Sequence, residues 1–330
     1  MVRVAVDGMG GDTAPHAIVK GAEIAAREGI AKIILVGDEK RLRSLLETPE
    51  SVEIVHAPSY VRMDESPSLA LRKKKDSSIN LAIELVREKK ADAVVSAGNS
   101  GATMAFAIFT LGRIKNVDRP AIATLHPNLK GGITVLLDAG GTVDCKPIHL
   151  AQFALMGDSF ARHILKITSP KIGLLSNGEE ITKGNELTKE AHSIIENMNL
   201  NYIGYVEGTD LYNGKVDVVV ADGFVGNIAL KISEGVVDVL LTFFKQNITR
   251  NLRGKIGYFL LKDTFKELAR KVDYAEYGGA PLLGVDGTCI ICHGKSNERA
   301  IRNAIILAKK FAENSLHEVL KKSMEEYGNS

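Results

Sequence analysis

Six short turns rich in glycine and small polar residues each follow an apolar run of this 330-residue chain. They begin at Asp7, Ser96, Asp138, Ser176, Asp222 and His293. Glycine lets a backbone approach a ligand closely, and the first turn of a following helix offers free N–H groups and a partial positive charge. A ligand held by such turns is anionic, and phosphate is the simplest. Any one of them is more often an ordinary loop between a strand and a helix, so the inference depends on all six together.

Three polar side chains beside these turns are the candidates for catalysis. Lys183 follows the fourth turn, where a cation would hold phosphate or a developing oxyanion. Asn227 follows the fifth turn, where its amide would donate to a thioester oxygen, and His293 would donate to phosphate or protonate a thiolate. Structural alternatives stay open for each of them: a solvated lysine, a helix N-cap and a histidine that only ends a strand.

The expected phosphate-binding residues come from three of the turns. They are Gly10, Gly11, Asn99, Ser100, Gly101 and Asn185. Asn185 is the weakest of them, because Asn at a helix start is usually a cap. The aspartates of the turns, Asp7, Asp12, Asp138 and Asp222, would repel an anion that they faced. We therefore expect most of them to accept hydrogen bonds from N–H groups of their own turns.

Several motifs of other enzyme classes are missing from the sequence. There is no Walker phosphate loop, dinucleotide fingerprint, G-x-S-x-G elbow or H-E-x-x-H pair. No two aspartates are four apart, as the metal pair of a decarboxylating dehydrogenase of this fold class would require. Cys289 and Cys292 have redox spacing, but side chains three apart on a strand point to opposite faces, which favours two core residues. The scattered histidines predict no metal site.

The amino-acid composition argues against several further classes of protein. Lys and Arg number 42 and Asp and Glu 40, a net charge of +2, and there is no Trp, which argues against nucleic-acid binding. Three cysteines are an odd, low count that favours a reducing cytosol. The first residues lack the apolar segment of a signal peptide, and no run reaches the ~18 apolar residues of a membrane span. We expect a cytoplasmic protein.

The elements that must position these turns follow from hydrophobic periodicity. Strands are predicted at 2–7, 32–36, 52–56, 92–97, 121–125, 133–138, 171–176, 201–206, 216–221 and 288–293, with helices at 14–28, 78–88, 148–165, 185–197 and 296–318. Several strands are continuous apolar runs, which is typical of a sheet covered on both faces. The pattern predicts an α/β fold around a largely parallel sheet. Ligands of such sheets bind outside the carboxyl ends of the strands, so we expect the six turns along one rim.

Motifs spread in order along almost the whole chain resemble one known family. They lie at 6–15, 72–78, 96–102, 152–157, 178–185, 222–227 and 273–285, the last reading DYAEYGGAPLLGV. On these residues the chain resembles the PlsX family, the bacterial acyl-ACP:phosphate acyltransferases of phospholipid synthesis. The resemblance implies transfer of a long-chain acyl group from acyl carrier protein (ACP) to inorganic phosphate, without a redox cofactor. The acyl phosphate would then pass to the membrane acyltransferase PlsY.

The resemblance also implies an architecture. It is a three-layer α/β/α sandwich with two lobes, similar to isocitrate and isopropylmalate dehydrogenases and to phosphotransacetylase, and it forms a homodimer. We expect residues 1–330 to form one two-lobed unit. Lobe one would comprise about 1–140 and 285–330, and lobe two about 141–284. The cleft between them would hold the site, and the protein would be cytoplasmic with peripheral membrane contact.

Two surface segments suggest partners. Arg72-Lys73-Lys74-Lys75 is the densest basic run and would suit the acidic ACP, although a solvated loop explains it equally well. Residues 236–271 read as an amphipathic helical hairpin with Arg250, Arg253 and other basic residues between apolar ones. Such a hairpin would pack in a dimer and touch an anionic membrane, or would simply belong to the core. The alternative functions are a phosphotransacetylase acting on acyl-CoA and a non-enzymatic scaffold.

Overall fold

One 11-stranded sheet extends through the whole molecule, in the order β3-β2-β1-β4-β11-β10-β5-β6-β9-β7-β8. The computed structural model describes residues 1–248, 252–272 and 274–328. Its strands are β1 (Arg3–Asp7), β2 (Lys32–Gly37), β3 (Glu53–His56), β4 (Ala93–Ser96), β5 (Ala121–Pro127), β6 (Ile133–Leu137), β7 (Ile172–Leu175), β8 (Tyr202–Val206), β9 (Val218–Val220), β10 (Ala280–Leu283) and β11 (Cys289–Ile291). All ten strands predicted from the apolar runs are confirmed, and β10 is an addition.

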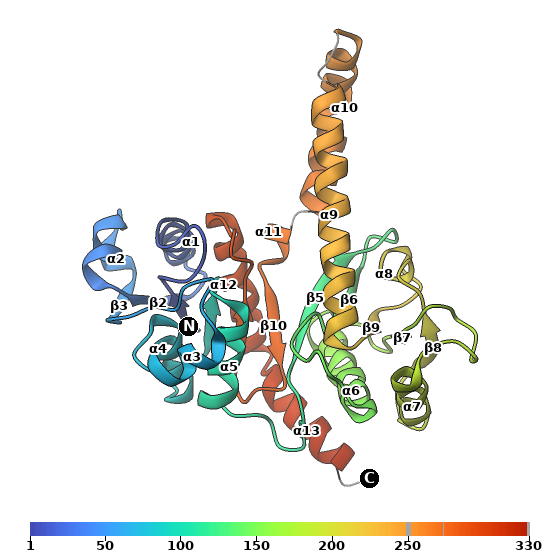
Figure 1. Cartoon of the computed structure of the whole chain (residues 1–330). Helices are drawn as coiled ribbons and strands as arrows, with labels where there is room; N and C mark the ends of the chain where they lie inside the picture. Colours follow the sequence, from blue (N-terminus) through green and yellow to red (C-terminus); the bar gives the residue numbers. More distant parts are fainter. Residues whose placement is uncertain (249–251, 273, 329–330) are drawn as a thin grey trace.

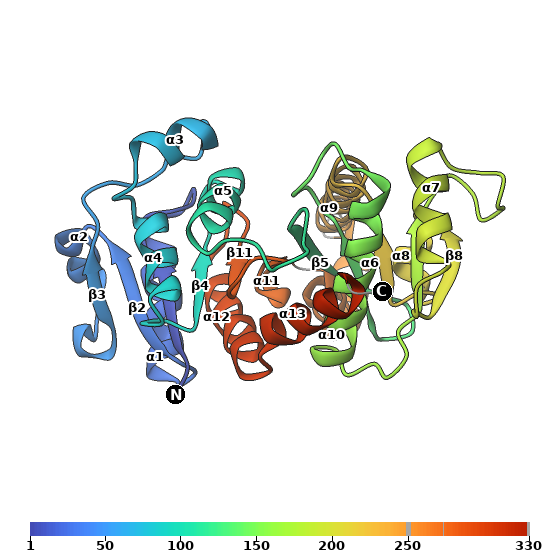
Figure 2. The ribbon, with the colours of Figure 1, turned by 90° about the horizontal axis from the view of Figure 1, so that it is seen from below.

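Helices cover both faces of the sheet (Figures 1 and 2). They are α1 (His16–Arg27), α2 (Glu39–Leu45), α3 (Pro67–Lys73), α4 (Ser78–Arg87), α5 (Ser100–Thr110), α6 (Pro147–His163), α7 (Glu186–Ile195), α8 (Asp210–Asn213), α9 (Gly223–Ile248), α10 (Leu252–Val272), α11 (Tyr274–Tyr277), α12 (Glu298–Glu313) and α13 (Leu316–Gly328), with a 3-10 turn at Pro49–Ser51. The expected three-layer α/β/α fold is confirmed.

The direction of the strands reverses near the middle of the sheet. β10 is antiparallel to both β11 and β5, and β5 is antiparallel to β6, while the pairs on either side are parallel. The strands of the two halves therefore run in opposite senses along the sheet, and the expectation of one continuous rim is wrong. The six turns form two groups, one on β1, β4 and β11 and one on β6, β7 and β9. Sheet twist rotates one half against the other, and Figure 2 shows α3 and α5 along the same edge as α7 and α9.

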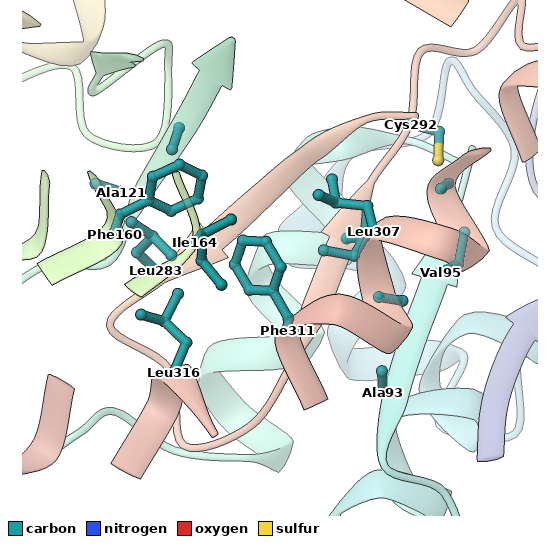
Figure 3. Packing of buried hydrophobic residues seen from close by; sticks show 14 of the residues in the cluster. Ala93, Val95, Ala121, Phe160, Ile164, Leu283, Cys292, Leu307, Phe311 and Leu316 are labelled. Carbon is teal, nitrogen blue, oxygen red and sulfur yellow. The ribbon is translucent and has the colours of Figure 1, made fainter. Parts of the chain in front are cut away.

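One of the hydrophobic core clusters joins the two halves. One cluster of buried side chains includes residues from α1 and α12 of the first half and from α6, α7 and α13 of the second. Phe160 of α6 and Ile164, directly after this helix, lie beside Phe311 of α12 and Leu316 of α13 (Figure 3). The rings of Phe160 and Phe311 are 5.5 Å apart between centroids. This cluster of buried side chains therefore spans both halves of the sheet.

The expected boundary near residue 140 crosses elements that are hydrogen-bonded to one another. β5 and β6, placed in lobe one from the sequence, pair with each other, and β6 pairs with β9. The C-terminal helix α13, also expected in lobe one, packs on α6. Asn116 Nδ2 donates to the Met324 carbonyl at 3.2 Å, which further ties α13 to the connection before β5.

The hairpin expected at residues 236–271 consists of α9 and α10, and α9 begins earlier, at Gly223. Figure 1 shows it projecting far from the sheet. Large apolar side chains along it are exposed, including Phe243, Phe259 and Leu260. Arg250, expected at its basic turn, and the side chain of Arg253 lie outside the described residues. None of the described helices is long and apolar enough to cross a membrane.

Candidate functional site

Asp138 organises the turn that follows β6. Its Oδ1 accepts hydrogen bonds from the N–H groups of Gly140 (3.2 Å), Gly141 (2.8 Å) and Ile122 (2.8 Å). Its Oδ2 accepts one from Thr142 at 2.6 Å. The carboxylate is fully buried. The N–H groups of this turn therefore point at Asp138, and they are not available to a phosphate.

Two other aspartates do the same for their own turns. Asp7, 2% exposed, accepts from the Met9 N–H at 3.2 Å and from the Ser96 hydroxyl at 2.8 Å. Asp222 accepts from the N–H groups of Phe224 and Val225, both at 3.0 Å, at the start of α9. The expectation that most of the aspartates tie down turn N–H groups is confirmed for these three. Asp12 differs, because it is exposed and its own N–H donates to the Gly294 carbonyl.

Burial shifts the titration of the two innermost carboxyls. Desolvation raises the pKa of Asp138 to about 6, against the four backbone N–H donors, which lower it. Desolvation also raises the pKa of Asp7, again against its hydrogen bonds. Both carboxyl groups accept hydrogen bonds from the N–H groups of their turns, so a change in their protonation would change the bonds that hold these turns.

Replacing Asp138 with asparagine is expected to remove a pH dependence of stability. The folded pKa of about 6 lies above the ordinary 3.8. The contribution of Asp138 to the free energy of unfolding is therefore fully present below pH 4 and is lost as the pH rises through about 6. The difference in free energy of unfolding between wild type and Asp138→Asn should change by about 2–3 kcal/mol across this window. Urea denaturation between pH 4 and 8 measures it, with exposed Asp144→Asn as control. Parallel curves for wild type and Asp138→Asn would contradict the assignment.

The turns after β1, β4 and β11 pack directly on one another. A Cβ atom on Gly10 would lie 2.3 Å from Asp7 Oδ2 and 2.8 Å from the Gly98 Cα, so only glycine fits there. Gly11 has a φ of +121° and lies against the carbonyls of Ala97 and Gly294. This packing leaves Gly10 and Gly11 close to β4 and β11. The close contacts of Gly10 with Asp7 and Gly98 give this glycine a packing role between the first two turns.

Asn99 has its side chain engaged within the protein. Its Oδ1 caps α5 by accepting from the Ala102 N–H at 3.0 Å. Its Nδ2 donates to the carbonyls of Met63 (2.9 Å) and Glu65 (3.0 Å). Asn99 thus fixes the segment before α3 against α5, and its side chain is not available to phosphate. The neighbouring Ser100 is exposed at the start of α5.

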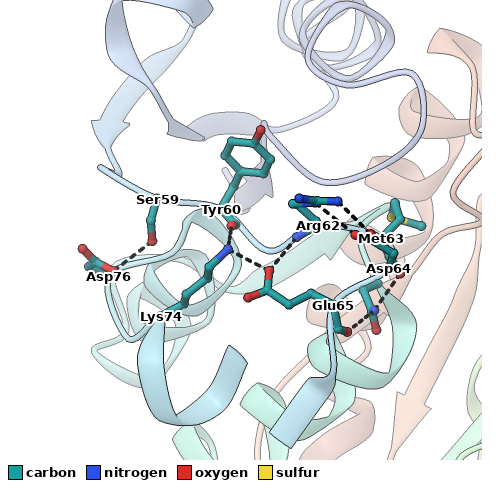
Figure 4. Close-up of polar contacts among 9 residues, drawn as sticks. Ser59, Tyr60, Arg62, Met63, Asp64, Glu65, Lys74 and Asp76 are labelled. Carbon is teal, nitrogen blue, oxygen red and sulfur yellow. Dashed lines mark hydrogen bonds and ion pairs between the residues drawn. The ribbon is translucent and has the colours of Figure 1, made fainter. Parts of the chain in front are cut away.

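The same segment is held by Lys74, the third residue of the basic run. Its Nζ donates to the Tyr60 carbonyl at 2.8 Å and pairs with Glu65 Oε2 at 2.7 Å (Figure 4). This pair lowers the pKa of Glu65, chiefly through the hydrogen bond. Lys74 is therefore committed within the fold, whereas Arg72, Lys73 and Lys75 are exposed.

Two expected residues lie in the turn between β7 and α7. Asn185 caps α7: its Oδ1 accepts from the Thr188 N–H at 2.9 Å, and its own N–H donates to Thr188 Oγ1 at 3.0 Å. The cap alternative for Asn185 is confirmed. Lys183 is exposed, and its side chain folds over Gly178, where an added Cβ would lie 2.8 Å from Lys183 Cγ. The Lys183 ammonium thus stays beside the strand-end turn.

Asn227 lies exposed near the start of α9, against the Asp138 turn. An added Cβ on Gly140 would lie 3.4 Å from the Asn227 Cβ and Cγ. Gly226 comes even closer to β6, since its Cβ would lie 1.9 Å from the Asp138 carbonyl oxygen. The close approach of α9 to β6 sets the position of Asn227. The N-cap alternative for Asn227 is wrong, because Asp222 accepts the N–H bonds at this helix start.

His293 is exposed at the end of β11, in the first group of turns. Its Nδ1 accepts from the Lys295 N–H at 3.2 Å, which leaves the proton of a neutral ring on Nε2. The expected residues therefore fall into two groups. Gly10, Gly11, Asn99, Ser100, Gly101 and His293 belong to the first, and Lys183, Asn185 and Asn227 to the second.

A cavity of about 420 Å³ lies in the second group, at the carboxyl ends of β7 and β9. Asn177 and Val225, which sequence reasoning missed, line it together with Asn185 and Asp222. Arg119, also missed, is exposed near Cys145 and His149. The Asp-Arg-Pro triplet before β5 carries no motif that would have singled it out. Among the described residues, no group of three or more His, Cys, Asp or Glu could hold a metal ion.

Comparison with known proteins covers almost the full length. Residues 2–319 match the family described as "Fatty acid synthesis protein". The phosphate acyltransferase of Pelobacter propionicus is 54% identical over 329 residues, covering 98% of this chain and 95% of that protein. The phosphate acyltransferase of Geobacter sulfurreducens is 52% identical over 328 residues, covering 98% and 94%.

Solved structures share the fold at low sequence identity. A phosphotransacetylase from Streptococcus pyogenes superposes with a TM-score of 0.63 at 18% identity, covering 94% of each chain. A 4-hydroxythreonine-4-phosphate dehydrogenase from Klebsiella pneumoniae gives 0.55 at 14% identity, covering 94% of this chain and 99% of that one. The expected likeness to phosphotransacetylase is confirmed at the level of the fold. The full-length matches show that the chain belongs to the fatty acid synthesis protein family of phosphate acyltransferases and is an enzyme of the acyltransferase class.

Proposed function

We propose that this enzyme moves a long-chain acyl group from acyl-ACP to inorganic phosphate by direct attack of bound phosphate on the thioester. The observation that carries the proposal is the identity of 52–54% with curated phosphate acyltransferases over 98% of the chain. The chemistry of the site agrees with it. Burial raises the pKa of Cys145, near the Asp138 turn, to about 12, so this thiol is a poor nucleophile at neutral pH. Phosphate does not need a side-chain nucleophile.

The reaction balances without a cofactor. An oxygen of hydrogen phosphate forms a bond to the thioester carbonyl carbon, and the carbonyl oxygen becomes an oxyanion. When this intermediate collapses, the carbon–sulfur bond breaks, leaving acyl phosphate. The thiolate of the carrier takes up the proton that hydrogen phosphate gives up.

The proposal assigns roles to both groups of turns. Ser100 and Gly101 would bind phosphate at the start of α5, where N–H groups and the helix dipole favour an anion. Lys183 and Asn227 would hold the thioester oxygen as its charge develops. His293, with its proton on Nε2, would donate to phosphate or to the departing thiolate.

The decisive experiment follows phosphate-dependent release of free ACP from a long-chain acyl-ACP, with acyl phosphate detected directly. We expect both products in equal amounts and none without phosphate. The same assay with acyl-CoA tests the alternative of a phosphotransacetylase acting on acyl-CoA. A higher kcat/KM with acyl-CoA than with acyl-ACP would favour that alternative.

Exposed basic and apolar side chains on the surface suggest which partners this enzyme binds. ACP is acidic, and the exposed Arg72, Lys73 and Lys75 beside α5 would receive it, with Lys74 holding the segment in place. The exposed apolar side chains of α9 and α10 would pack in a homodimer and reach an anionic membrane at the far end of the hairpin. Peripheral contact of this kind would deliver the acyl phosphate to the membrane acyltransferase PlsY.

Charged substitutions on α10 test the membrane contact. Phe259 and Leu260 are each 75% exposed, so Phe259→Asp and Leu260→Asp should not disturb the fold. We expect the double variant to bind vesicles of anionic phospholipid at least roughly tenfold more weakly, because two apolar anchors are lost and two negative charges added. Co-sedimentation with vesicles measures this. Thr264→Asp, exposed on the same helix, is the control. Unchanged vesicle binding by the double variant would reject the membrane role.

A further inference from the structure

The cavity at the carboxyl ends of β7 and β9 has the size of a small-molecule site. Its volume is about 420 Å³, and ligand pockets generally measure about 300–1,000 Å³. It lies where α6, α7 and α9 meet the sheet. The lining residues are Leu150, Leu174, Leu175, Ser176, Asn177, Gly184, Asn185, Thr188, Ala221, Asp222 and Val225.

The lining divides into an aliphatic floor and a polar rim. Leu150 and Leu174 are fully buried behind the surface of the cavity, and Leu175 and Ala221 nearly so. The apolar lining that a ligand can touch therefore comes mainly from Val225, which is 40% exposed. The rim is built from the turn after β7, where Asn177 Oδ1 accepts from the Gly184 N–H at 2.9 Å. A ligand with an apolar body and a polar end matches this division.

The polar end of such a ligand would meet the candidate catalytic residues. Lys183 stands in the turn that forms the rim, with its stem packed on Gly178, next to Asn177. On the other side, Val225 lines the cavity two residues before Asn227, in the first turn of α9. Lys183 and Asn227 do not line the cavity themselves, but each is close to it in sequence: Lys183 precedes Gly184, and Asn227 follows Val225 by two residues.

We infer that this cavity binds the aliphatic chain of the acyl substrate and that Val225 at its mouth takes part in selecting chain length. The inference rests on the proposed function, because it places the thioester carbonyl between Lys183 and Asn227. Apolar lining packed against a chain of methylenes removes apolar surface from water on both sides. Each methylene buried in this way raises affinity roughly fourfold.

Binding can be tested without any turnover, because the chain contains no Trp. Val225→Trp places a single fluorophore at the mouth, and Ile228→Trp places one on the same helix outside the cavity. The exposures of the two native residues are 40% and 43%, which makes them a matched pair. Stearate brominated at mid-chain should quench most of the emission of Val225→Trp and little of that of Ile228→Trp, while unbrominated stearate should quench neither. Equal quenching in both variants would overturn the inference.

A second measurement, of chain-length selectivity, covers the case in which the indole ring of the Val225→Trp variant would itself fill the cavity and prevent stearate from binding. Val225→Phe should lower the ratio of kcat/KM for a long-chain donor to that for a four-carbon donor by at least roughly tenfold, and Ile228→Phe should leave the ratio as in wild type. An unchanged ratio in Val225→Phe together with no selective quenching overturns the inference while the proposed function stands. Selective quenching in a protein that transfers no acyl group from any donor would instead reject the proposed function and keep the binding site.

Discussion

Lys183→Ala is expected to lower turnover by at least tenfold, and by about 100- to 1,000-fold if the ammonium stabilises the oxyanion directly. Lys183 is exposed, and its stem packs on Gly178 in the turn between β7 and α7. Removing the ammonium takes away the cation that the second group of turns would offer to the thioester oxygen. The effect should fall mainly on kcat, because the charge it balances is larger in the transition state than in the ground state.

Further measurements decide whether the loss of turnover in Lys183→Ala comes from the missing ammonium or from a disturbed fold. Lys189→Ala removes another exposed lysine, on the outer part of α7, and should leave turnover near wild type. Thermal unfolding of Lys183→Ala should match wild type, since surface substitutions of this kind change the free energy of unfolding by less than about 0.5 kcal/mol. Asn227→Ala should also lose at least roughly tenfold in turnover, through loss of one amide donor. Near-normal activity in both Lys183→Ala and Asn227→Ala would reject the assignment of these residues.

Gly226→Ala is expected to cost the protein most of its activity together with at least about 3 kcal/mol of stability. Its Cβ would lie 1.9 Å from the Asp138 carbonyl oxygen, a backbone atom held by the sheet. The new methyl group can be accommodated only if α9 moves away from β6. This shift would displace Asn227 and disturb the turn that Asp138 organises.

Gly235→Ala, on the same helix, provides the matched control. Nothing lies within 4 Å of a Cβ built on Gly235. Alanine in a helix interior is favoured over glycine by about 0.5–1 kcal/mol, so this variant should be slightly more stable than wild type and fully active. Urea denaturation and the phosphate-dependent assay measure both variants. A Gly226→Ala protein with wild-type stability would show that the contact between α9 and β6 is not as tight as described.

Most of the elements and the turn chemistry could be predicted from the sequence, because both depend on neighbours along the chain. Several of the ten predicted strands are apolar runs buried on both faces, such as Val218–Val220. Asp138 accepts hydrogen bonds from N–H groups two to four residues further along the chain, and Asp222 accepts them from N–H groups two and three residues further along. Such short-range contacts can be expected from the local sequence.

Strand β10 could not be predicted from local sequence patterns. It contains Pro281, and a proline within an apolar run argues against a strand. In the fold it lies between β11 and β5 and is antiparallel to both. Together with the antiparallel pair of β5 and β6, these pairings reverse the direction of the strands between the two halves of the sheet and separate the turns into two groups.

The sequence by itself determined the family, the α/β elements and the residue types that meet an anion, since these depend on motifs and on spacing within a few residues. Only the tertiary structure decided which of the expected ligands are engaged elsewhere. Asn99 is bonded to Met63 and Glu65, more than 30 residues away, and Gly10 is packed on Gly98. The cavity near Lys183 likewise joins side chains from α6, β7, α7, α9 and the turn after β9. Contacts between segments so far apart follow from how the elements pack, which no local pattern encodes.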